Sequence, residues 1–305
     1  MPSATQGTFR LFRFLGIDVY LHWSWFLLAL YEVRGTGMYS SISWNVLEYL
    51  CLFAIITMHE FGHALACRQV GGKANQIVLW PFGGIAFVDP PQRPGATLWS
   101  IAAGPLVNVV LAPLLWAAYS VALSNGWSSS LPDQWNLLFR VYWIDVGLLA
   151  FNMLPVYPLD GGQILRSLLW FVLGRARSLT VATVVGLFGL VGLLGLALWQ
   201  KSVWLGLITV YLLFNCWGGL MHARTLSRMA SLPRRDGFAC PNCKAAPPIG
   251  DAWRCSNCKQ NFDTFQTNGV CPHCAAQYNV TRCLECGEAR PIAQWMSSAF
   301  TPSGL

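Results

Sequence analysis

The segment ITMHEFGHALACRQV (residues 56–70) places two histidines and a glutamate at the end of a long apolar run. His59 and His63 are four residues apart, so on a helix both side chains lie on one face and can bind the same metal ion. Glu60 follows His59 directly and can accept a proton from a water molecule beside that metal. Ionisable groups inside a membrane span are costly and by default mark a functional site. We therefore expect a catalytic zinc site within the membrane, the alternative being polar groups that line a helix bundle.

A catalytic zinc ion needs a third protein ligand and an open position for water. The candidate is Asp160 in FNMLPVYPLDGGQILRSL (residues 151–168), at the end of an expected membrane helix over residues 137–159. This helix and the helix that carries the histidines both run from the outer to the cytoplasmic side in the expected topology. His63 and Asp160 should therefore lie at similar depth near the cytoplasmic face.

The C-terminal region contains a second kind of metal-binding pattern, four C-x-x-C pairs. They are Cys240 and Cys243, Cys255 and Cys258, Cys271 and Cys274, and Cys283 and Cys286. The spacing predicts two structural zinc sites with four thiolates each, made from consecutive pairs and similar to bacterial double zinc ribbons. A cross-braced arrangement, first pair with third and second with fourth, remains open. His273 lies inside one pair and is expected to point outward.

The charge of this region argues against nucleic acid as a partner. Residues 237–290 contain five Lys/Arg and four Asp/Glu, a balance of +1. Each zinc ion with four thiolates adds about −2, so two sites bring the module to about −3. Nucleic-acid binding needs a basic surface. A protein partner of the zinc-ribbon tail is the better expectation.

The composition is that of a membrane protein. Hydrophobic residues make up 54% and charged residues 11%, against roughly 25% charged in soluble domains. A membrane helix needs about 20 mostly apolar residues. Six segments are candidates: 16–32, 44–67, 96–123, 137–159, 179–199 and 203–221. The fold class is thus a mainly α, polytopic helix bundle.

Lysine and arginine gather in alternate loops between these helices, which predicts that both termini lie in the cytoplasm of a multi-pass cell-membrane protein. The expected domains are a membrane domain over residues 1–223, a basic linker over 224–238, and the zinc-ribbon domain and tail over 239–305. Between the second and third helices, residues 75–91 are rich in β-branched and aromatic side chains and contain Gly83-Gly84. They predict a short hairpin at the membrane surface, in which residues 77–88 could supply a free edge that pairs with an unwound substrate; the alternative is an interfacial loop without this role.

Two widely spaced motifs give a specific resemblance. HEFGH at residues 59–63, followed by Asn152-x-x-Pro155-x-x-Pro158-Leu159-Asp160-Gly161, resembles the site-2 protease family of intramembrane zinc metalloproteases. GPLVN (104–108), PFGG (81–84) and LHW (21–23) match in the right order, over residues 15–222. The resemblance implies that His59, His63 and Asp160 bind zinc and that Glu60 is the general base. Asn108 and Asn152 match the family's intramembrane asparagines, which could stabilise the oxyanion; the alternative for both is helix–helix packing.

Two polar residues stay outside the predicted site. His22 is expected to be a satisfied interior group, and Asp145 to lie nearer the outer side, in a water-filled cavity or hydrogen-bonded to an interior partner. The predicted function is intramembrane proteolysis of membrane-anchored substrates, such as anchored regulators or remnant signal peptides. The alternatives are a membrane zinc transporter or sensor, which would not need Glu60 as a base, and an inactive scaffold.

Overall fold

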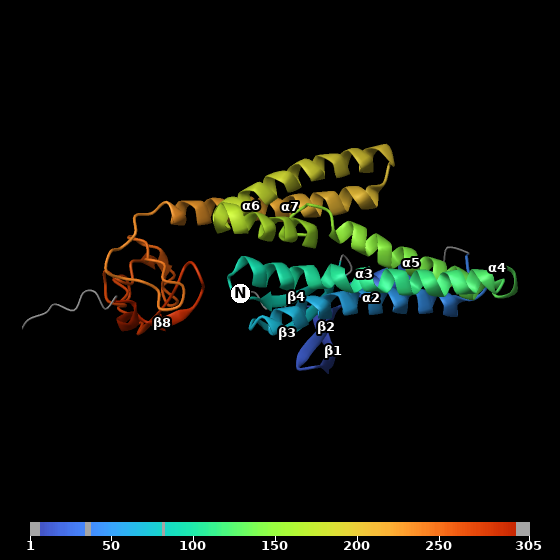
Figure 1. The fold of residues 1–305 in the computed structure, drawn as a ribbon, viewed down its shortest axis with the longest axis horizontal. Coiled ribbons are helices and arrows are strands. Elements are labelled where there is room, and N and C mark those ends of the chain that lie inside the picture. The colour runs from blue at the N-terminus through green and yellow to red at the C-terminus, as the bar shows by residue number, and fades with distance from the viewer. Residues whose placement is uncertain (1–6, 34–37, 81–82, 297–305) are drawn as a thin grey trace, which may run out of the picture. The chain divides into compact units, whose positions relative to one another are not determined.

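The computed structural model describes residues 7–33, 38–80 and 83–296 (Figure 1). The first part of the chain forms β1 (Thr8–Phe14), β2 (Ile17–His22), α1 (Trp25–Val33), α2 (Ile42–Gln69), β3 (Lys73–Trp80) and β4 (Gly83–Asp89). Then follow α3 (Pro94–Ser124), α4 (Trp127–Ser130), α5 (Pro132–Asn152), α6 (Asp160–Trp199) and α7 (Val203–Ala230). The C-terminal region contains β5 (Trp253–Arg254), β6 (Asn261–Phe262), β7 (Val280–Arg282), β8 (Ala289–Pro291) and a 3-10 turn, Ile292–Trp295.

Four helices in the described residues are long and apolar enough to cross a membrane: α2, α3, α6 and α7. Six such helices were predicted; α5, with 21 residues, is long enough to cross but is not one of these four. The candidate over residues 16–32 is instead strand β2 followed by the nine-residue helix α1. Its first half alternates, with Ile17, Val19 and Leu21 buried, which is the period of a strand and not of a helix. The candidate over 137–159 corresponds to α5, which ends earlier, at Asn152.

The strands of the membrane domain form one sheet in the order β1-β2-β3-β4. The hairpin predicted between the second and third helices is confirmed as the antiparallel pair β3 and β4, which runs from Lys73↔Asp89 to Trp80↔Gly83 with a register shift between Ala74 and Gln76. Strand β2 pairs parallel to β3, and β1 pairs antiparallel to β2. Neither of these two N-terminal strands was predicted from the sequence. Strand β4 lies at one edge of the sheet.

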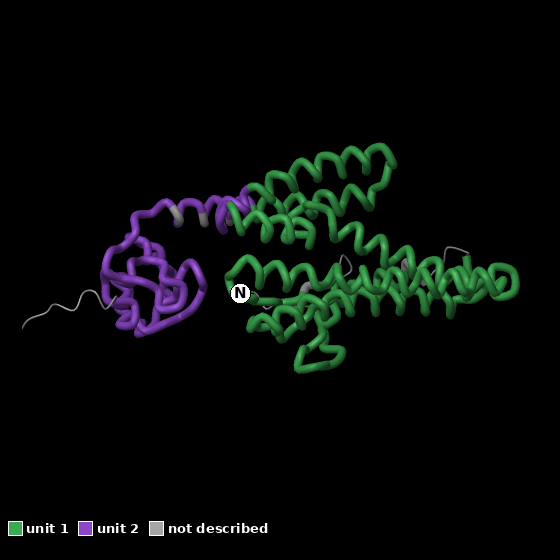
Figure 2. Tube along the Cα trace, in the orientation of Figure 1, with its two compact units in different colours: residues 1–172, 181–219 green, residues 173–180, 220–305 purple. Residues whose placement is uncertain are grey.

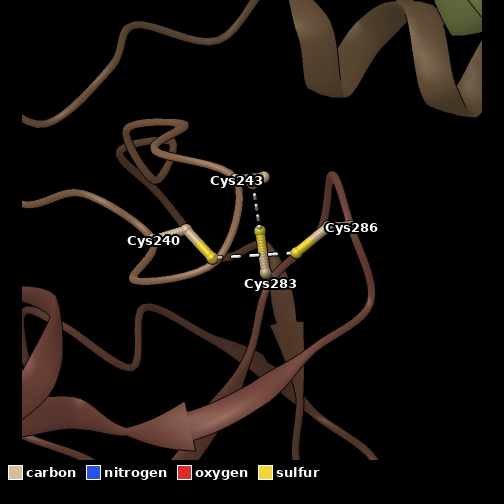
Figure 3. A group of neighbouring side chains, drawn as sticks. All are labelled: Cys240, Cys243, Cys283 and Cys286. Atoms are coloured by element: carbon tan, nitrogen blue, oxygen red, sulfur yellow. Dashed lines mark hydrogen bonds between the residues drawn. The ribbon is translucent and has the colours of Figure 1, made fainter. Parts of the chain in front are cut away.

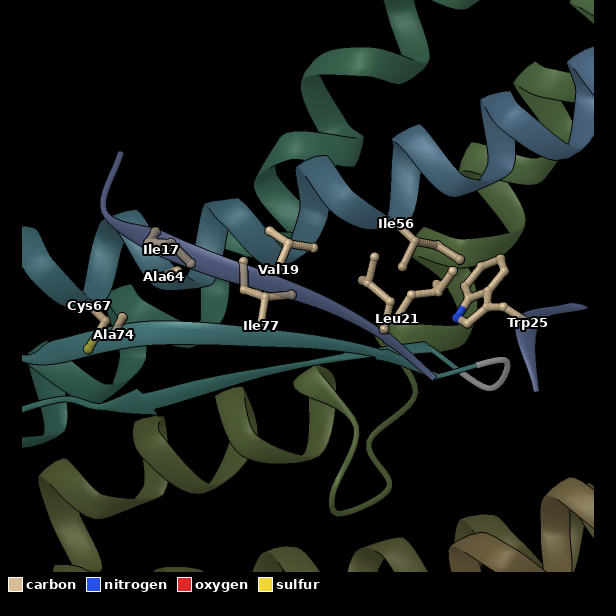
Figure 4. Packing of buried hydrophobic residues seen from close by; sticks show 10 residues of the cluster. Ile17, Val19, Leu21, Trp25, Ile56, Ala64, Cys67, Ala74 and Ile77 are labelled. Atoms are coloured by element: carbon tan, nitrogen blue, oxygen red, sulfur yellow. The ribbon is translucent and has the colours of Figure 1, made fainter. Parts of the chain in front are cut away.

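The sheet is held against α2 by a hydrophobic core (Figure 4). Ile17, Val19 and Ile77 point from β2 and β3 toward Ala64 of α2 and are fully buried. Each such side chain contributes about 1.5–3 kcal/mol through its removal from water. Because α2 also carries the two histidines, this core fixes the position of the sheet relative to them.

Helix α6 begins at Asp160, so this residue is not at the end of the fourth expected helix but at the start of the next one. The helix breaks between Asn152 and Asp160 because Pro155 and Pro158 cannot continue helical hydrogen bonding. A kink at Gly174 (φ 76°, ψ 172°) interrupts α6 further on. The short connection lets Asp160 turn back toward α2.

The chain divides into two compact units (Figure 2). The first comprises residues 1–172 and 181–219, and the second residues 173–180 and 220–305. Helix α7 continues to Ala230, so the first residues of the expected linker are helical.

Candidate metal centres

His59, His63 and Asp160 meet in a buried cluster in the first unit. The Nε2 atoms of the two histidines are 3.1 Å apart. The Oδ2 atom of Asp160 lies 3.0 Å from Nε2 of His59 and 3.4 Å from Nε2 of His63. The convergence predicted from the topology is therefore present, although Asp160 lies at the start of α6 and not at the end of the preceding helix.

These distances fit a zinc ion. Tetrahedral zinc with ligands at about 2.0–2.1 Å places its ligand atoms about 3.3 Å apart, close to the three separations in the cluster. Both histidines also use Nδ1 elsewhere: His63 Nδ1 donates to the backbone oxygen of Ser100 at 3.0 Å, and His59 Nδ1 lies 2.6 Å from Oδ1 of Asn108. Each Nε2 of a neutral ring then presents a lone pair toward the other and toward the carboxylate. These lone pairs repel one another and the carboxylate of Asp160. A cation between them removes this repulsion, so the donor set fits the metal that the sequence predicts.

Glu60 lies beside this cluster and contacts the edge strand. It is buried, and its Oε2 atom accepts a hydrogen bond from the backbone N–H of Ala86 on β4 at 2.8 Å. The side chain packs flat on the strand: a Cβ atom added to Gly84 would lie 2.2 Å from Cγ of Glu60 and 2.5 Å from its Oε1. A glycine is therefore required at residue 84 to leave room for the predicted base.

A second glycine makes room for a metal ligand. A Cβ atom added to Gly104 on α3 would lie 2.3 Å from Nε2 of His63, the atom that would bind metal. Both glycines belong to the motifs that match the site-2 protease family, but their steric role, and the contributions of Ser100 and Ala86, could not be predicted from the sequence. The only signal was the position of the two glycines in PFGG and GPLVN.

The two asparagines occupy different positions. Asn108 is fully buried on α3, with Oδ1 facing His59 and Nδ2 donating to Oδ1 of Asp145 at 2.6 Å. Both of its polar atoms are therefore used within the protein. Asn152 is the last residue of α5 and is half-buried, and its amide makes none of the side-chain hydrogen bonds found among the described residues.

His22 and Asp145, which were predicted to lie outside the metal site, do not belong to the cluster of ligands. His22 stacks on Trp80 with ring centroids 4.0 Å apart and hydrogen-bonds to the hydroxyl of Ser24. Asp145 has an interior hydrogen-bond partner, as expected, but it is nearer the metal site than expected. Asn108 alone separates it from His59.

The eight cysteines of the second unit form two further clusters, with a pairing that differs from the prediction. The first pair meets the fourth (Cys240, Cys243, Cys283 and Cys286), and the second meets the third (Cys255, Cys258, Cys271 and Cys274). The prediction of consecutive pairs was wrong, and so was the cross-braced alternative. We call the site of the first and fourth pairs the outer site and that of the second and third pairs the inner site. The inner site is nested, because its four cysteines lie in the sequence between the two pairs of the outer site. Sequence spacing alone does not distinguish these arrangements, because each of them brings two C-x-x-C pairs together.

Figure 3 shows the sulfur atoms of the outer cluster pointing toward one another, with Sγ atoms of Cys240 and Cys286 3.7 Å apart. In the inner cluster the Sγ atoms of Cys255 and Cys274 are 3.6 Å apart. Zinc–sulfur bonds of about 2.3 Å place thiolates at tetrahedral corners about 3.8 Å apart. Both clusters therefore fit a four-thiolate zinc ion. His273 is exposed and belongs to neither cluster, as expected.

All four pairs form the same turn. The residue that follows each pair adopts a positive φ and donates its N–H to the carbonyl of the first cysteine; these residues are Lys244, Lys259, Ala275 and Gly287. In the inner site the hydroxyl of Tyr278 lies 3.1 Å from Sγ of Cys255, and this hydrogen bond, together with backbone N–H groups of the turn, lowers the pKa of the Cys255 thiol to about 6. The lowered pKa favours the thiolate form, which is the form that binds zinc.

Comparisons with known proteins agree with this geometry. The model of Peptidase family M50 matches residues 48–134 and 125–196. A zinc metalloprotease of Methanocaldococcus jannaschii is 30% identical over 68% of this chain and 58% of its own length. A putative zinc metalloprotease of Synechocystis is 28% identical over 59% of this chain and 49% of its own length. The chain thus spans about half the length of these curated relatives.

A solved structure has the same fold. The site-2 protease from Methanocaldococcus jannaschii superposes with a TM-score of 0.50 and 26% identity, over 70% of this chain and 95% of that one. The matched region contains His59, His63 and Asp160. The membrane part of this chain therefore belongs to peptidase family M50, the site-2 protease family of membrane zinc metalloproteases.

Proposed function

We propose that this chain is an intramembrane zinc endopeptidase that hydrolyses peptide bonds in or near transmembrane segments of membrane-anchored proteins. The observation that carries the proposal is the buried cluster of His59, His63 and Asp160 with a carboxylate, Glu60, beside it. A transporter or sensor could use the same three ligands. It would have no need for an additional buried carboxylate packed on a sheet edge.

The residues of the site have separate roles in this reaction. His59, His63 and Asp160 would hold a zinc ion, which lowers the pKa of a bound water and polarises a substrate carbonyl. Glu60 would accept the proton of the attacking water and deliver it to the leaving amine. The half-buried amide of Asn152 is free to donate a hydrogen bond to the carbonyl oxygen as negative charge develops there.

Strand β4 supports a route for the substrate. A transmembrane helix hides its peptide bonds in internal hydrogen bonds, so a protease must first unwind it. An extended segment can satisfy its freed backbone groups by adding to a sheet edge. β4 is an edge strand, and Glu60 contacts its Ala86. The substrate class we propose is therefore a membrane segment that can become extended next to β4, as in anchored regulators or signal-peptide remnants.

The orientation and the tail complete the proposal. The distribution of lysine and arginine supports a multi-pass protein with both termini in the cytoplasm. The cytoplasm is reducing, which suits eight thiolates that bind two structural zinc ions. The balance of charge in residues 237–290 supports a protein partner for the tail over nucleic acid.

The direct test is cleavage of a membrane-anchored reporter by the full chain in liposomes. The comparison is between the natural chain and Glu60→Gln, which keeps the shape of the side chain and removes the proton acceptor. We expect Glu60→Gln to lower the rate by about 100-fold or more. Glu48→Gln is a matched control, because Glu48 is also a buried carboxylate on α2 but pairs with Arg140 at 2.8 Å. Equal cleavage by natural chain and Glu60→Gln would refute peptidase activity at this site.

A further inference from the structure

A chain of two buried hydrogen bonds connects His59 with a carboxylate on another helix. Nδ1 of His59 on α2 lies 2.6 Å from Oδ1 of Asn108 on α3, and Nδ2 of Asn108 donates to Oδ1 of Asp145 on α5 at 2.6 Å. His59 is 3% exposed, and Asn108 and Asp145 are fully buried. Three helices are thus joined through the ring of one metal ligand.

The carboxyl group of Asp145 determines which group donates and which accepts in both hydrogen bonds. A carboxylate oxygen facing an amide accepts hydrogen bonds, so Asp145 requires the NH₂ group of Asn108 on its side. The Asn108 oxygen must then face His59, and Nδ1 of His59 must carry the proton. Nε2 is left with its lone pair, directed at Oδ2 of Asp160 3.0 Å away. One carboxylate therefore selects the tautomer in which His59 can bind metal.

The tautomer of His63 is fixed without a second side chain. His63 donates Nδ1–H to the backbone carbonyl of Ser100, a group that can only accept and that the helix holds in place. The partner of His59 is a side-chain amide, whose oxygen and NH₂ group exchange places when it rotates by about 180°. Without Asp145, either end of Asn108 could face His59.

We propose that Asp145 is a positioning residue of the metal centre, which fixes the orientation of Asn108 and through it the tautomer of His59. The inference rests on the proposed zinc site and adds to it a residue that no ligand pattern identifies. It also gives Asn108 the role of orienting a ligand instead of donating to an oxyanion. The buried carboxyl group of Asp145 acts on zinc affinity and not only on the packing of α3 against α5.

The test is zinc affinity of the full chain in detergent, measured by competition with a chelator. His59→Ala serves as the reference in which only the cysteine sites can bind. Asp145→Leu leaves the amide of Asn108 without its acceptor and should weaken the membrane site about 10–100-fold. Asp145→Asn, which keeps the shape, should weaken it less, because the new amide can accept or donate.

An exchange of the two side chains gives the sharpest comparison. Asn108→Asp alone places two carboxylates 2.6 Å apart and should weaken zinc binding about as much as Asp145→Leu. The double variant Asn108→Asp with Asp145→Asn restores both hydrogen bonds, since the new aspartate accepts from His59 and from the new asparagine. It should bind zinc within about threefold of the natural chain.

A purely structural role is distinguished by Glu48→Gln, which weakens a partly buried contact between α2 and α5 without touching His59. This variant should lower thermal stability and leave zinc affinity unchanged. The proposal is overturned if Asp145→Leu binds zinc as the natural chain does, if the exchange restores nothing, or if Glu48→Gln weakens zinc binding equally. If the natural chain itself binds no more zinc than His59→Ala, the proposed function fails instead.

Discussion

Glu60 of α2 and Ala86 of β4 are joined by a hydrogen bond of 2.8 Å from the backbone N–H of the strand to the carboxylate. It places the predicted base against the strand that lies at the edge of the sheet. The hydrophobic core between the sheet and α2 holds both partners in place. Chemistry and substrate pairing would therefore take place on adjoining surfaces, and small changes at this contact should affect catalysis more than metal binding.

Gly84→Ala should separate these two effects. Its Cβ atom would lie 2.2 Å from Cγ of Glu60, so the base must move while the three metal ligands stay in place. We expect zinc content to be unchanged and the cleavage rate to fall by roughly 100-fold. Gly147→Ala is the matched control, because a Cβ atom there meets nothing within 4 Å. Full activity of Gly84→Ala would show that the position of Glu60 is not critical.

Gly104→Ala should act on the metal instead. The added methyl group would lie 2.3 Å from Nε2 of His63, which displaces a ligand atom directly. We expect the membrane site to lose most of its zinc and all of its activity, measured as zinc per chain and as cleavage of the reporter. Zinc content equal to that of Gly147→Ala would contradict the proposed coordination by His63.

The ligands of the membrane site could be predicted from the sequence because their types and spacing are chemically restrictive. Two histidines four residues apart lie on one face of a helix and can share a metal there, and an aspartate beside prolines in an apolar segment stands out. The surroundings of these ligands could not be predicted in the same way. The acceptor for His63 is a backbone carbonyl, that of Ser100, and backbone atoms have no signature in the sequence.

The errors in the fold have physical causes as well. β2 was predicted to be part of a membrane helix because its apolar residues lead directly into those of α1, although they alternate along β2, which pairs with β3. Asp145 was placed too far from the metal because the sequence does not show how closely α3 and α5 pack around Asn108. The nested pairing of cysteines depends on contact between the first and the fourth C-x-x-C pair, which are far apart in the sequence.

The nested pairing can be tested by counting zinc. Cys258 and Cys271 belong to the same inner site here, but to different sites in either the consecutive or the cross-braced arrangement. The double variant Cys258→Ser with Cys271→Ser should therefore lose one zinc ion per chain. Cys255→Ser with Cys258→Ser, which alters a single pair, should lose one ion in every arrangement and serves as the control. Loss of two ions from the first variant alone would contradict nesting.

The proposed topology can be tested by labelling cysteines in intact cells with a reagent that does not cross the membrane. Ser128 is exposed in α4, between α3 and α5, and a cysteine at this position should react from outside. A cysteine at Ser303 should react only after the cells are opened. The natural chain, with its own cysteines, provides the background signal. Labelling at residue 303 from outside would exclude a cytoplasmic C-terminus.

The most direct test of the central claim compares Asp160→Ala with Glu60→Gln in the full chain, with zinc content and cleavage measured on the same preparations. Asp160 supplies one of three ligand atoms, so its removal should cost one zinc ion per chain together with all activity. Glu60 should contact the water and not the metal, so Glu60→Gln should keep the zinc content of the natural chain while cleavage falls by about 100-fold or more. Normal cleavage by Glu60→Gln, or normal zinc content in Asp160→Ala, would contradict the assignment of base and ligand.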